Sequence, residues 1–178
     1  MKKFLLAAVL VLTALPLMAT TILFVSNEES VRMSELILIG RVVNVENTYD
    51  REGQIVRNIT LSVKEVLKGK VQPGANFTFR AWGGVKDGVR DEALGEAKYK
   101  VGEKVLLQLE NVEGAYHTLG LSFGKWNVEK EKAGREMIRR DLSGLTGVKA
   151  EKAPVPMILE LKQMRELVQK LERERLVR

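Results

Sequence analysis

The sequence predicts a mainly β protein, built as a small closed or partly closed antiparallel barrel of five to six strands. Short stretches with strand character recur through the middle of the chain and are separated mostly by brief turns. No helical pattern falls between them, which argues against the crossover helices of a parallel sheet. Helical patterns appear near the two ends, so we expect a short N-terminal helix and an amphipathic C-terminal helix.

The first residues have the order of a secretory signal peptide. Met1, Lys2 and Lys3 precede an apolar run over residues 4–18, and small residues follow it. We expect cleavage after Ala19, so that residues 1–19 are the signal and the mature protein is secreted or periplasmic. Because residues 22–25 extend the apolar run toward the roughly 20 residues that span a bilayer, an uncleaved membrane anchor is the alternative.

The first elements of the expected mature chain are a short strand, a helix and a longer strand. Residues 21–25 are apolar enough for the short strand. Ser26 and Glu29 have capping-box spacing, which predicts a helix from there to about Ser34. Residues 36–46 are apolar and β-branched, and Gly40 within them predicts a bend or a bulge.

Two strands with one wet face follow. Turn residues at 50–53 lead into residues 54–66, in which apolar side chains alternate with polar ones. The alternation returns over residues 76–82. Residues 83–95 are rich in glycine and charge, which indicates a long loop or a small hairpin.

The last strands are expected at residues 104–110 and 116–128, paired across a turn, with a short final hairpin around Met137 and Ile138. These elements place the barrel domain at residues 20–150. Pro154 and Pro156 mark its boundary with residues 151–178, which we expect to form a helix packed on the barrel. The predicted apolar stripe of that helix is Ile158, Leu161, Met164, Leu167, Val168 and Leu171.

The residue counts exclude several kinds of site. The 178 residues include no cysteine and one histidine, so a disulfide scaffold, a thiol nucleophile and a two-histidine metal site are ruled out. We expect no metal and no cofactor. The net charge of +6 includes two lysines of the signal, and the basic residues near 125–140 alternate with acidic ones, so no nucleic-acid partner is predicted.

Three patterns have residue types that can carry out catalysis or bind a metal ion. Ser122 and Lys125 have the Ser-x-x-Lys spacing of serine acyl-enzymes, but they lie in a strand-like run rather than on a helix. His117 is interpreted as a solvated or hydrogen-bonded strand residue. The acidic residues of turns 50–52 and 87–92 are interpreted as turn residues, because calcium loops need a denser spacing of oxygen ligands. No catalytic residue is therefore predicted.

The candidate ligand-binding residues are Trp82 and Trp126, at the ends of two predicted strands, with the neighbouring cations Arg80 and Lys125. Exposed aromatic residues on a small barrel can stack on sugars or bases. Packing in the core or at the rim is the competing interpretation of both tryptophans.

Five stretches, LILIGRVVNVE, VKEVLKGK, VGEKVLLQLE, GLSFGKWNV and RDLSGL, resemble a recurring pattern in secreted bacterial proteins of unassigned function. Their order also resembles the OB-like barrel of tissue metalloprotease inhibitors and netrin modules. This resemblance implies an OB-like barrel over residues 20–150. In the inhibitors, an N-terminal cysteine places its amine and carbonyl on the protease zinc. A chain that begins near Thr20 offers an amine there but no cysteine.

The expected function is that of an exported, non-enzymatic binding domain that recognises a protein or an envelope component and acts as a monomer. Modulation of a secreted protease is one specific form of this hypothesis. Two alternatives stay open. One is a membrane-tethered assembly factor, which requires an uncleaved N-terminal segment, and the other is an envelope hydrolase that uses Ser122 and Lys125.

Overall fold

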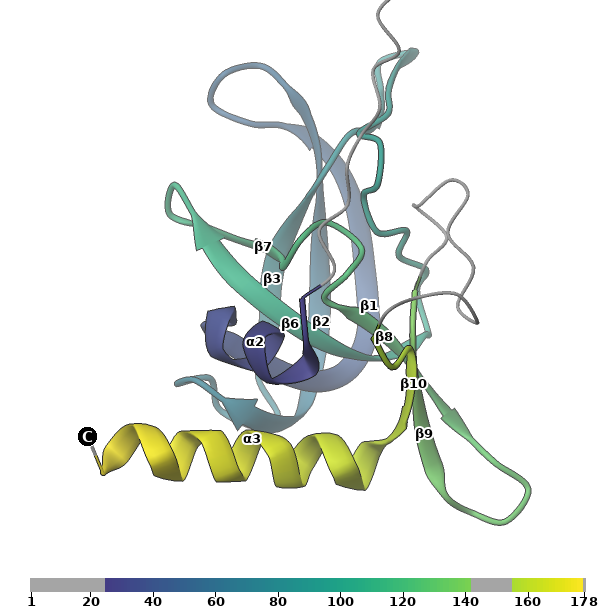
Figure 1. The fold of residues 1–178 in the computed structure, drawn as a ribbon. Coiled ribbons are helices and arrows are strands. Elements are labelled where there is room, and N and C mark those ends of the chain that lie inside the picture. Colours follow the sequence, from purple (N-terminus) through teal and green to yellow (C-terminus); the bar gives the residue numbers. More distant parts are fainter. Residues whose placement is uncertain (1–24, 142–154, 178) are drawn as a thin grey trace, which may run out of the picture.

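The computed structural model describes residues 25–141 and 155–177, so the predicted signal at residues 1–19 and most of the predicted strand at 21–25 lie outside the described residues. The protein is mainly β, with 49% strand and 16% helix, as the sequence predicts. The elements are α2 (Asn27–Met33), β1 (Leu36–Tyr49), β2 (Ile55–Lys68), β3 (Asn76–Trp82), β4 (Gly84–Lys86), β5 (Val89–Asp91), β6 (Lys104–Val112), β7 (Ala115–Thr118), β8 (Lys125–Lys130), β9 (Glu136–Arg140), β10 (Ile158–Glu160) and α3 (Leu161–Leu176) (Figure 1).

The N-terminal helix forms where the sequence predicts it. The Ser26 side chain accepts a hydrogen bond from the Glu29 amide at 3.1 Å, which satisfies one of the unpaired amides of the first turn. Ser30 and Val31 are the buried residues of α2. The helix therefore presents one narrow face to the sheet behind it.

Strands β1 and β2 form a long antiparallel pair with three irregularities in register, one of them between Ile39 and Gly40. A Cβ atom at Gly40 would lie 2.3 Å from the backbone oxygen of Ser62, so a larger residue does not fit against β2 there. The glycine permits the close approach of the two backbones, as the sequence indicates.

One sheet contains eight strands in the order β1-β2-β3-β7-β6-β8-β9-β10, and β1 also pairs with β6. The pairings thus lead from β1 through β2, β3, β7 and β6 back to β1. All of these pairs are antiparallel except β3 and β7, which meet in parallel where Arg80 faces His117. Strands β4 and β5 form a separate two-stranded sheet.

The strands bury two apolar clusters, one on each side of β1 and β6. The inner cluster lies among β1, β2, β3 and β6, and the outer cluster lies between the sheet and the two helices. Because both faces of β1 are covered at its start, residues 36–39 are all buried, and the sequence there is continuously apolar instead of alternating. The outer cluster consists of Val31, Ile37, Ile39, Leu106, Trp126, Ile138, Leu161, Met164, Val168 and Leu171.

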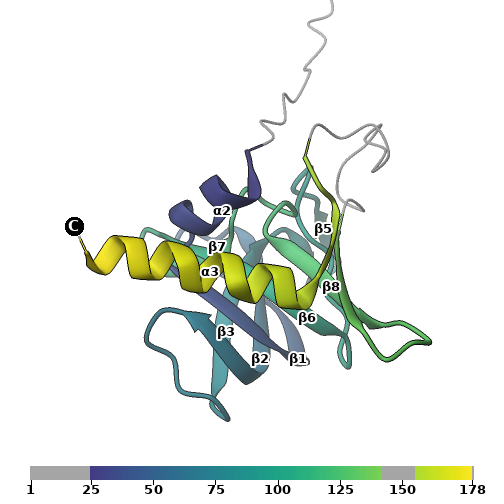
Figure 2. The same cartoon turned by 60° about the horizontal axis from the view of Figure 1, so that its bottom comes forward.

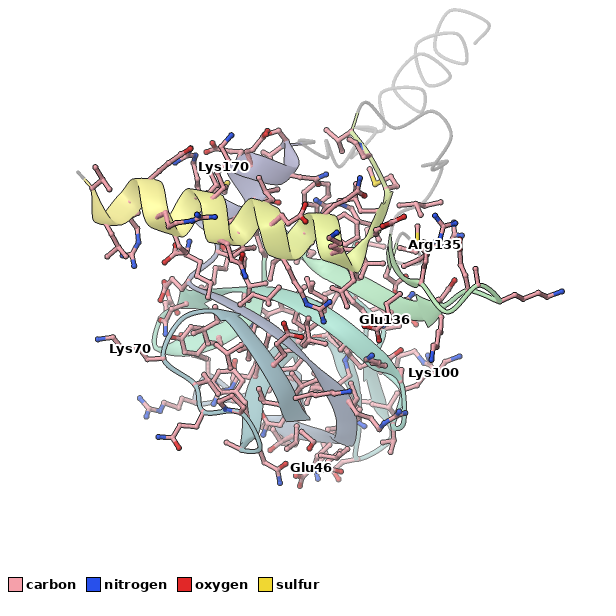
Figure 3. The ribbon with its side chains drawn as sticks, turned by 90° about the horizontal axis from the view of Figure 1, so that it is seen from below. Glu46, Lys70, Lys100, Arg135, Glu136 and Lys170 are labelled. Carbon is pink, nitrogen blue, oxygen red and sulfur yellow. The ribbon has the colours of Figure 1, made fainter. Side chains whose placement is uncertain are left out.

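Helix α3 lies across the sheet beside α2 (Figures 2 and 3). Its buried residues are Leu161, Met164, Val168 and Leu171, four of the six in the predicted stripe. The Arg165 guanidinium donates two hydrogen bonds to the Glu65 carboxylate, at 2.8 and 2.7 Å, and so fixes the helix to β2. The predicted stripe begins too early in the chain. Its first residue, Ile158, is 42% exposed and belongs to β10, which pairs with β9.

The predicted number of strands is too small, since the described residues contain ten. The predicted strand at 116–128 is in fact β7 and β8, separated by a turn. Gly120 and Leu121 in that turn both have positive φ, of 55° and 62°, so an extended strand cannot continue through them. The region 83–95, predicted as a loop or a small hairpin, contains the hairpin of β4 and β5. Asp87 and Gly88, both with positive φ, form its two-residue turn.

No helix in residues 25–141 or 155–177 is both long enough and apolar enough to cross a membrane.

Candidate functional site

The structure separates the four candidate ligand-binding residues into two pairs. Arg80 and Trp82 lie on β3, and both are partly exposed. Lys125 and Trp126 lie on β8, and both are buried. The two pairs belong to different environments, one that a ligand can reach and one that it cannot.

Trp126 is a core residue, and its prediction as a ligand contact does not fit the structure. Its side chain has no exposed surface, and it packs in the outer cluster beneath α2 and α3. The indole Nε1 donates to Gln108 Oε1 at 3.0 Å, and Gln108 Nε2 donates to Ser30 Oγ at 3.0 Å. The polar atom of the indole is therefore used to join the sheet to α2.

Lys125 is likewise held inside the protein, with 1% of its surface exposed. Its Nζ lies 3.0 Å from a carboxylate oxygen of Glu103 and 3.0 Å from one of Asp141, and it sits over the Tyr99 ring at 4.7 Å. It also donates to the Lys98 carbonyl. The ammonium is neutralised and hydrogen-bonded, so it is not placed to bind an external ligand.

The Ser122 hydroxyl does not use Lys125 as a base in this arrangement. Ser122 is fully buried, and its Oγ has no hydrogen-bond partner among the described residues. The Lys125 ammonium is instead paired with the carboxylates of Glu103 and Asp141, and it donates to the Lys98 carbonyl.

Within the accessible pair, Trp82 lies against His117 of β7. Their rings stack with centroids 4.5 Å apart and an interplanar angle of 18°. Arg80 faces His117 across the parallel contact between β3 and β7. Phe79 and Ala81 point into the inner core, so the alternation of β3 places Arg80 and Trp82 together on its other face.

His117 is 5% exposed, and its Nδ1 is buried without a hydrogen-bond partner among the described residues. Burial, and secondarily the positive charge of Arg80, lowers the pKa of His117 below its ordinary value. The imidazole is therefore neutral at pH 7. The sequence interpretation of His117 as a solvated or hydrogen-bonded residue misses this environment, which arises from strands distant in sequence.

Arg80, Trp82 and His117 line a hollow of about 460 Å³, named here the turn hollow. Its other walls are the turn between β1 and β2 and the turn between β6 and β7, which contribute Asp50, Arg51, Glu52, Gln54, Val112, Glu113, Gly114 and Ala115. Asp50 accepts hydrogen bonds from the Glu52 and Gln54 amides at 2.9 and 2.8 Å. This aspartate shapes its turn, as the sequence interpretation of the acidic turns expects.

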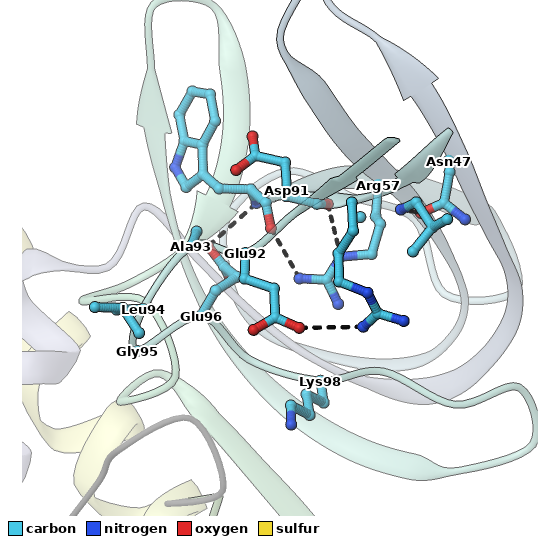
Figure 4. Close-up of a pocket in the computed structure, with 14 residues that line it drawn as sticks. Asn47, Arg57, Asp91, Glu92, Ala93, Leu94, Gly95, Glu96 and Lys98 are labelled. Atoms are coloured by element: carbon cyan, nitrogen blue, oxygen red, sulfur yellow. Dashed lines mark hydrogen bonds and ion pairs between the residues drawn. The ribbon is translucent and has the colours of Figure 1, made fainter. Parts of the chain in front are cut away.

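A second hollow of about 450 Å³ is also lined by Trp82, together with residues of the hairpin of β4 and β5 and of the segment that follows it (Figure 4). Arg57 reaches it from β2 and donates to the carbonyls of Trp82 and Gly83 at 2.9 and 3.1 Å. Glu96 accepts from the Trp82 amide at 3.2 Å. Burial raises the pKa of Glu96, although its bonds with backbone amides and the charge of Arg57 oppose that effect. Arg57 and Glu96 therefore fix the backbone that carries Trp82.

Sequence reasoning missed Arg57 and Glu96. Arg57 occupies a position of β2 that the alternation assigns to the core, where a charged residue is unexpected, and this break in the pattern was the available signal. Glu96 follows an irregular segment and carries no periodic signal.

Within the part of the chain that the structure describes, no group of three or more histidine, aspartate or glutamate side chains is arranged to hold a metal ion. No protein-family model matches the chain, and no curated protein matches it significantly.

Proposed function

We propose that the protein is an exported, non-enzymatic binding domain that recognises a protein or an envelope component through the surface around Trp82. The observation behind this proposal is the position of Trp82. Its partly exposed indole lines both hollows, and side chains on β2, β7 and the 83–96 segment hold its ring and its backbone in place. A fixed aromatic side chain between two hollows is a typical ligand contact.

The strand pairings support an OB-like barrel as the scaffold. The circuit β1-β2-β3-β7-β6-β1 closes with one parallel pair, and the turn hollow lies where its two hairpin turns approach β3. In OB folds, ligands bind on the face of the second and third strands, between the loops that join strands one to two and four to five. The turn at 50–54 and the turn at 113–114 hold these places here. This correspondence supports the turn hollow as the binding surface.

Two structural observations weigh against the alternatives. The hydrolase alternative requires the Lys125 side chain to accept a proton from Ser122. In the structure, that side chain is paired with Glu103 and Asp141. In the assembly-factor alternative, the C-terminal helix would also have to dock a partner with its apolar stripe. In the structure that stripe is buried on the protein's own sheet. Protease modulation remains a specific form of the binding proposal.

Intrinsic fluorescence tests the proposal, since the chain has two tryptophans and Trp126 is fully buried. Soluble glycans and peptides of envelope type are titrated into the purified full chain. A ligand at the proposed surface changes the emission of the wild type, and the Trp82→Phe variant loses that change. Calorimetry then compares affinities for the wild type, Trp82→Ala and Val43→Ala, in which an exposed apolar residue outside both hollows is shortened. Equal affinity for all three proteins would refute the proposed surface.

A further inference from the structure

The lining of the turn hollow includes a guanidinium that has no partner among the described residues. Arg80 is partly buried and lines the hollow, yet its guanidinium makes no hydrogen bond or ion pair with any residue in the described ranges. By comparison, Arg57 on the adjacent strand β2 and the buried Arg140 of β9 both donate hydrogen bonds. A guanidinium presents a planar set of N–H donors that matches a carboxylate. Arg80 therefore offers the hollow an unused binding group.

His117 adds a second unused group beside it. The residue is buried, with 5% of its surface exposed, and its Nδ1 is unpartnered among the described residues. Stacking against Trp82 fixes the plane of the ring. An anion next to the imidazole would favour the protonated form, which the burial of His117 and the charge of Arg80 now oppose.

The remaining charged groups around His117 are engaged or lie at the rim. Glu110 faces His117 from β6, and its carboxylate accepts from the Gly120 amide at 3.2 Å. Asp50 accepts the amides of its own turn. Arg51, Glu52 and Glu113 are exposed on the two turns. The acidic residues near the entrance disfavour a polyanion, whereas a single negative charge can reach the basic inner wall.

We propose that the turn hollow binds the carboxylate group of its ligand through Arg80 and His117, with the Trp82 indole as the apolar wall beside it. This inference rests on the proposed function and specifies the chemistry of the ligand. Binding is coupled to a proton, because the carboxylate stabilises the imidazolium of His117. Affinity therefore rises as the pH falls through the pKa of His117.

The test uses the fact that His117 is the only histidine of the chain. Its imidazole proton NMR signals are thus identified without further assignment, and their pH titration gives the pKa of His117 directly. The full chain is titrated in acetate and in chloride at equal ionic strength. Acetate is expected to raise the pKa by about half a unit or more, as a nearby opposite charge does.

Two variants separate a specific site from a general charge effect. Arg80→Gln removes the proposed partner, and the acetate effect on His117 is expected to disappear. Arg139→Gln removes the same charge from an exposed residue of β9, outside the lining of the turn hollow, and should retain the effect. No pKa difference between acetate and chloride in the wild type, or an equal difference in Arg80→Gln, overturns the inference.

Matched ligand pairs identify the source of the carboxylate. Methyl glucuronide is compared with methyl glucoside, and N-acetylglutamate is compared with N-acetylglutamine. A pKa rise with only the acidic sugar supports a carboxylated glycan, and a rise with only the acidic amino acid supports a peptide. If an envelope ligand binds in a Trp82-dependent way but Arg80→Gln binds it equally well, the inference fails and the proposed function stands. If acetate binds but neither a peptide nor an envelope ligand does, the proposed function fails instead.

Discussion

Individual side chains in this protein divide into those that hold the structure and those that a ligand can reach. Trp126 and Lys125 are fully enclosed, and their polar atoms are satisfied by Gln108, Glu103 and Asp141. Arg80 and Trp82 are partly exposed, and His117 below them keeps an unpartnered nitrogen among the described residues. Residue type alone does not separate these groups, because each contains a tryptophan and a cation.

Stability should depend on pH through His117. Its folded pKa lies below the unfolded value, so between these two values the unfolded chain binds more protons. The free energy of unfolding therefore falls as the pH decreases from 7 through the ordinary pKa of histidine, and this contribution levels off below the folded pKa. Each unit of pKa difference corresponds to about 1.4 kcal/mol. Urea unfolding of the wild type and His117→Gln across this range measures the contribution as the difference between the two pH profiles. Parallel profiles would contradict it.

Lys125→Met should destabilise the protein by about 3–5 kcal/mol, because it leaves the largely buried carboxylates of Glu103 and Asp141 without their cation. The exposed pair of Arg90 and Glu92 provides the control. Arg90→Met should cost about 1 kcal/mol or less, as exposed ion pairs do. The midpoints of chemical unfolding compare the two variants, and similar costs would show that the Lys125 cluster is not a buried ion pair in solution.

At the scale of elements, the parts of the fold that local pattern governs could be predicted from the sequence. The Ser26 cap, the Gly40 irregularity and the alternation of β2 are all encoded within a few residues. The break between β7 and β8 was missed because Leu121, a residue that rarely adopts positive φ, does so here. The start of α3 was placed too early because Ile158 fits the helical spacing, although pairing with β9 makes it part of a strand.

Gly40→Ala tests the close approach of β1 and β2. The added Cβ would lie 2.3 Å from the Ser62 carbonyl oxygen, which is backbone and cannot turn away. We expect a loss of about 1–3 kcal/mol, the usual cost of overpacking. Gly53→Ala is a useful comparison, because a Cβ atom at Gly53 meets open space. Any cost of this variant comes from the positive φ of 79° at Gly53 and not from a clash. Thermal unfolding in which Gly40→Ala matches the wild type would contradict the register at this bulge.

Met164→Ala tests the docking of α3. Met164 is fully buried between the helix and the sheet, so its truncation should cost about 2–5 kcal/mol. The exposed Lys162 on the same helix is the matched control, and Lys162→Ala should change stability by about 0.5 kcal/mol or less. Equal urea midpoints for these two variants would show that α3 does not bury this stripe in solution.

At the scale of the whole molecule, two apolar layers share the strands β1 and β6, and the proposed binding surface contains no residue of the helices. The inner cluster organises the strand circuit, and the outer cluster fixes α2 and α3. The sequence could indicate the β-rich class and both helices, because these follow from periodicity. It could not bring Arg80, Trp82 and His117 together, since their proximity depends on the single parallel contact between β3 and β7.

The most direct test of a Trp82-centred binding function is co-sedimentation of the purified full chain with an isolated bacterial envelope fraction. The wild type should sediment with the fraction in a saturable way, and Trp82→Ala should lose at least about tenfold in affinity, equivalent to about 1.4 kcal/mol. Val43→Ala should sediment like the wild type. Equal, saturable binding of Trp82→Ala and the wild type would contradict the account, and the absence of binding by all three proteins would contradict recognition of an envelope component.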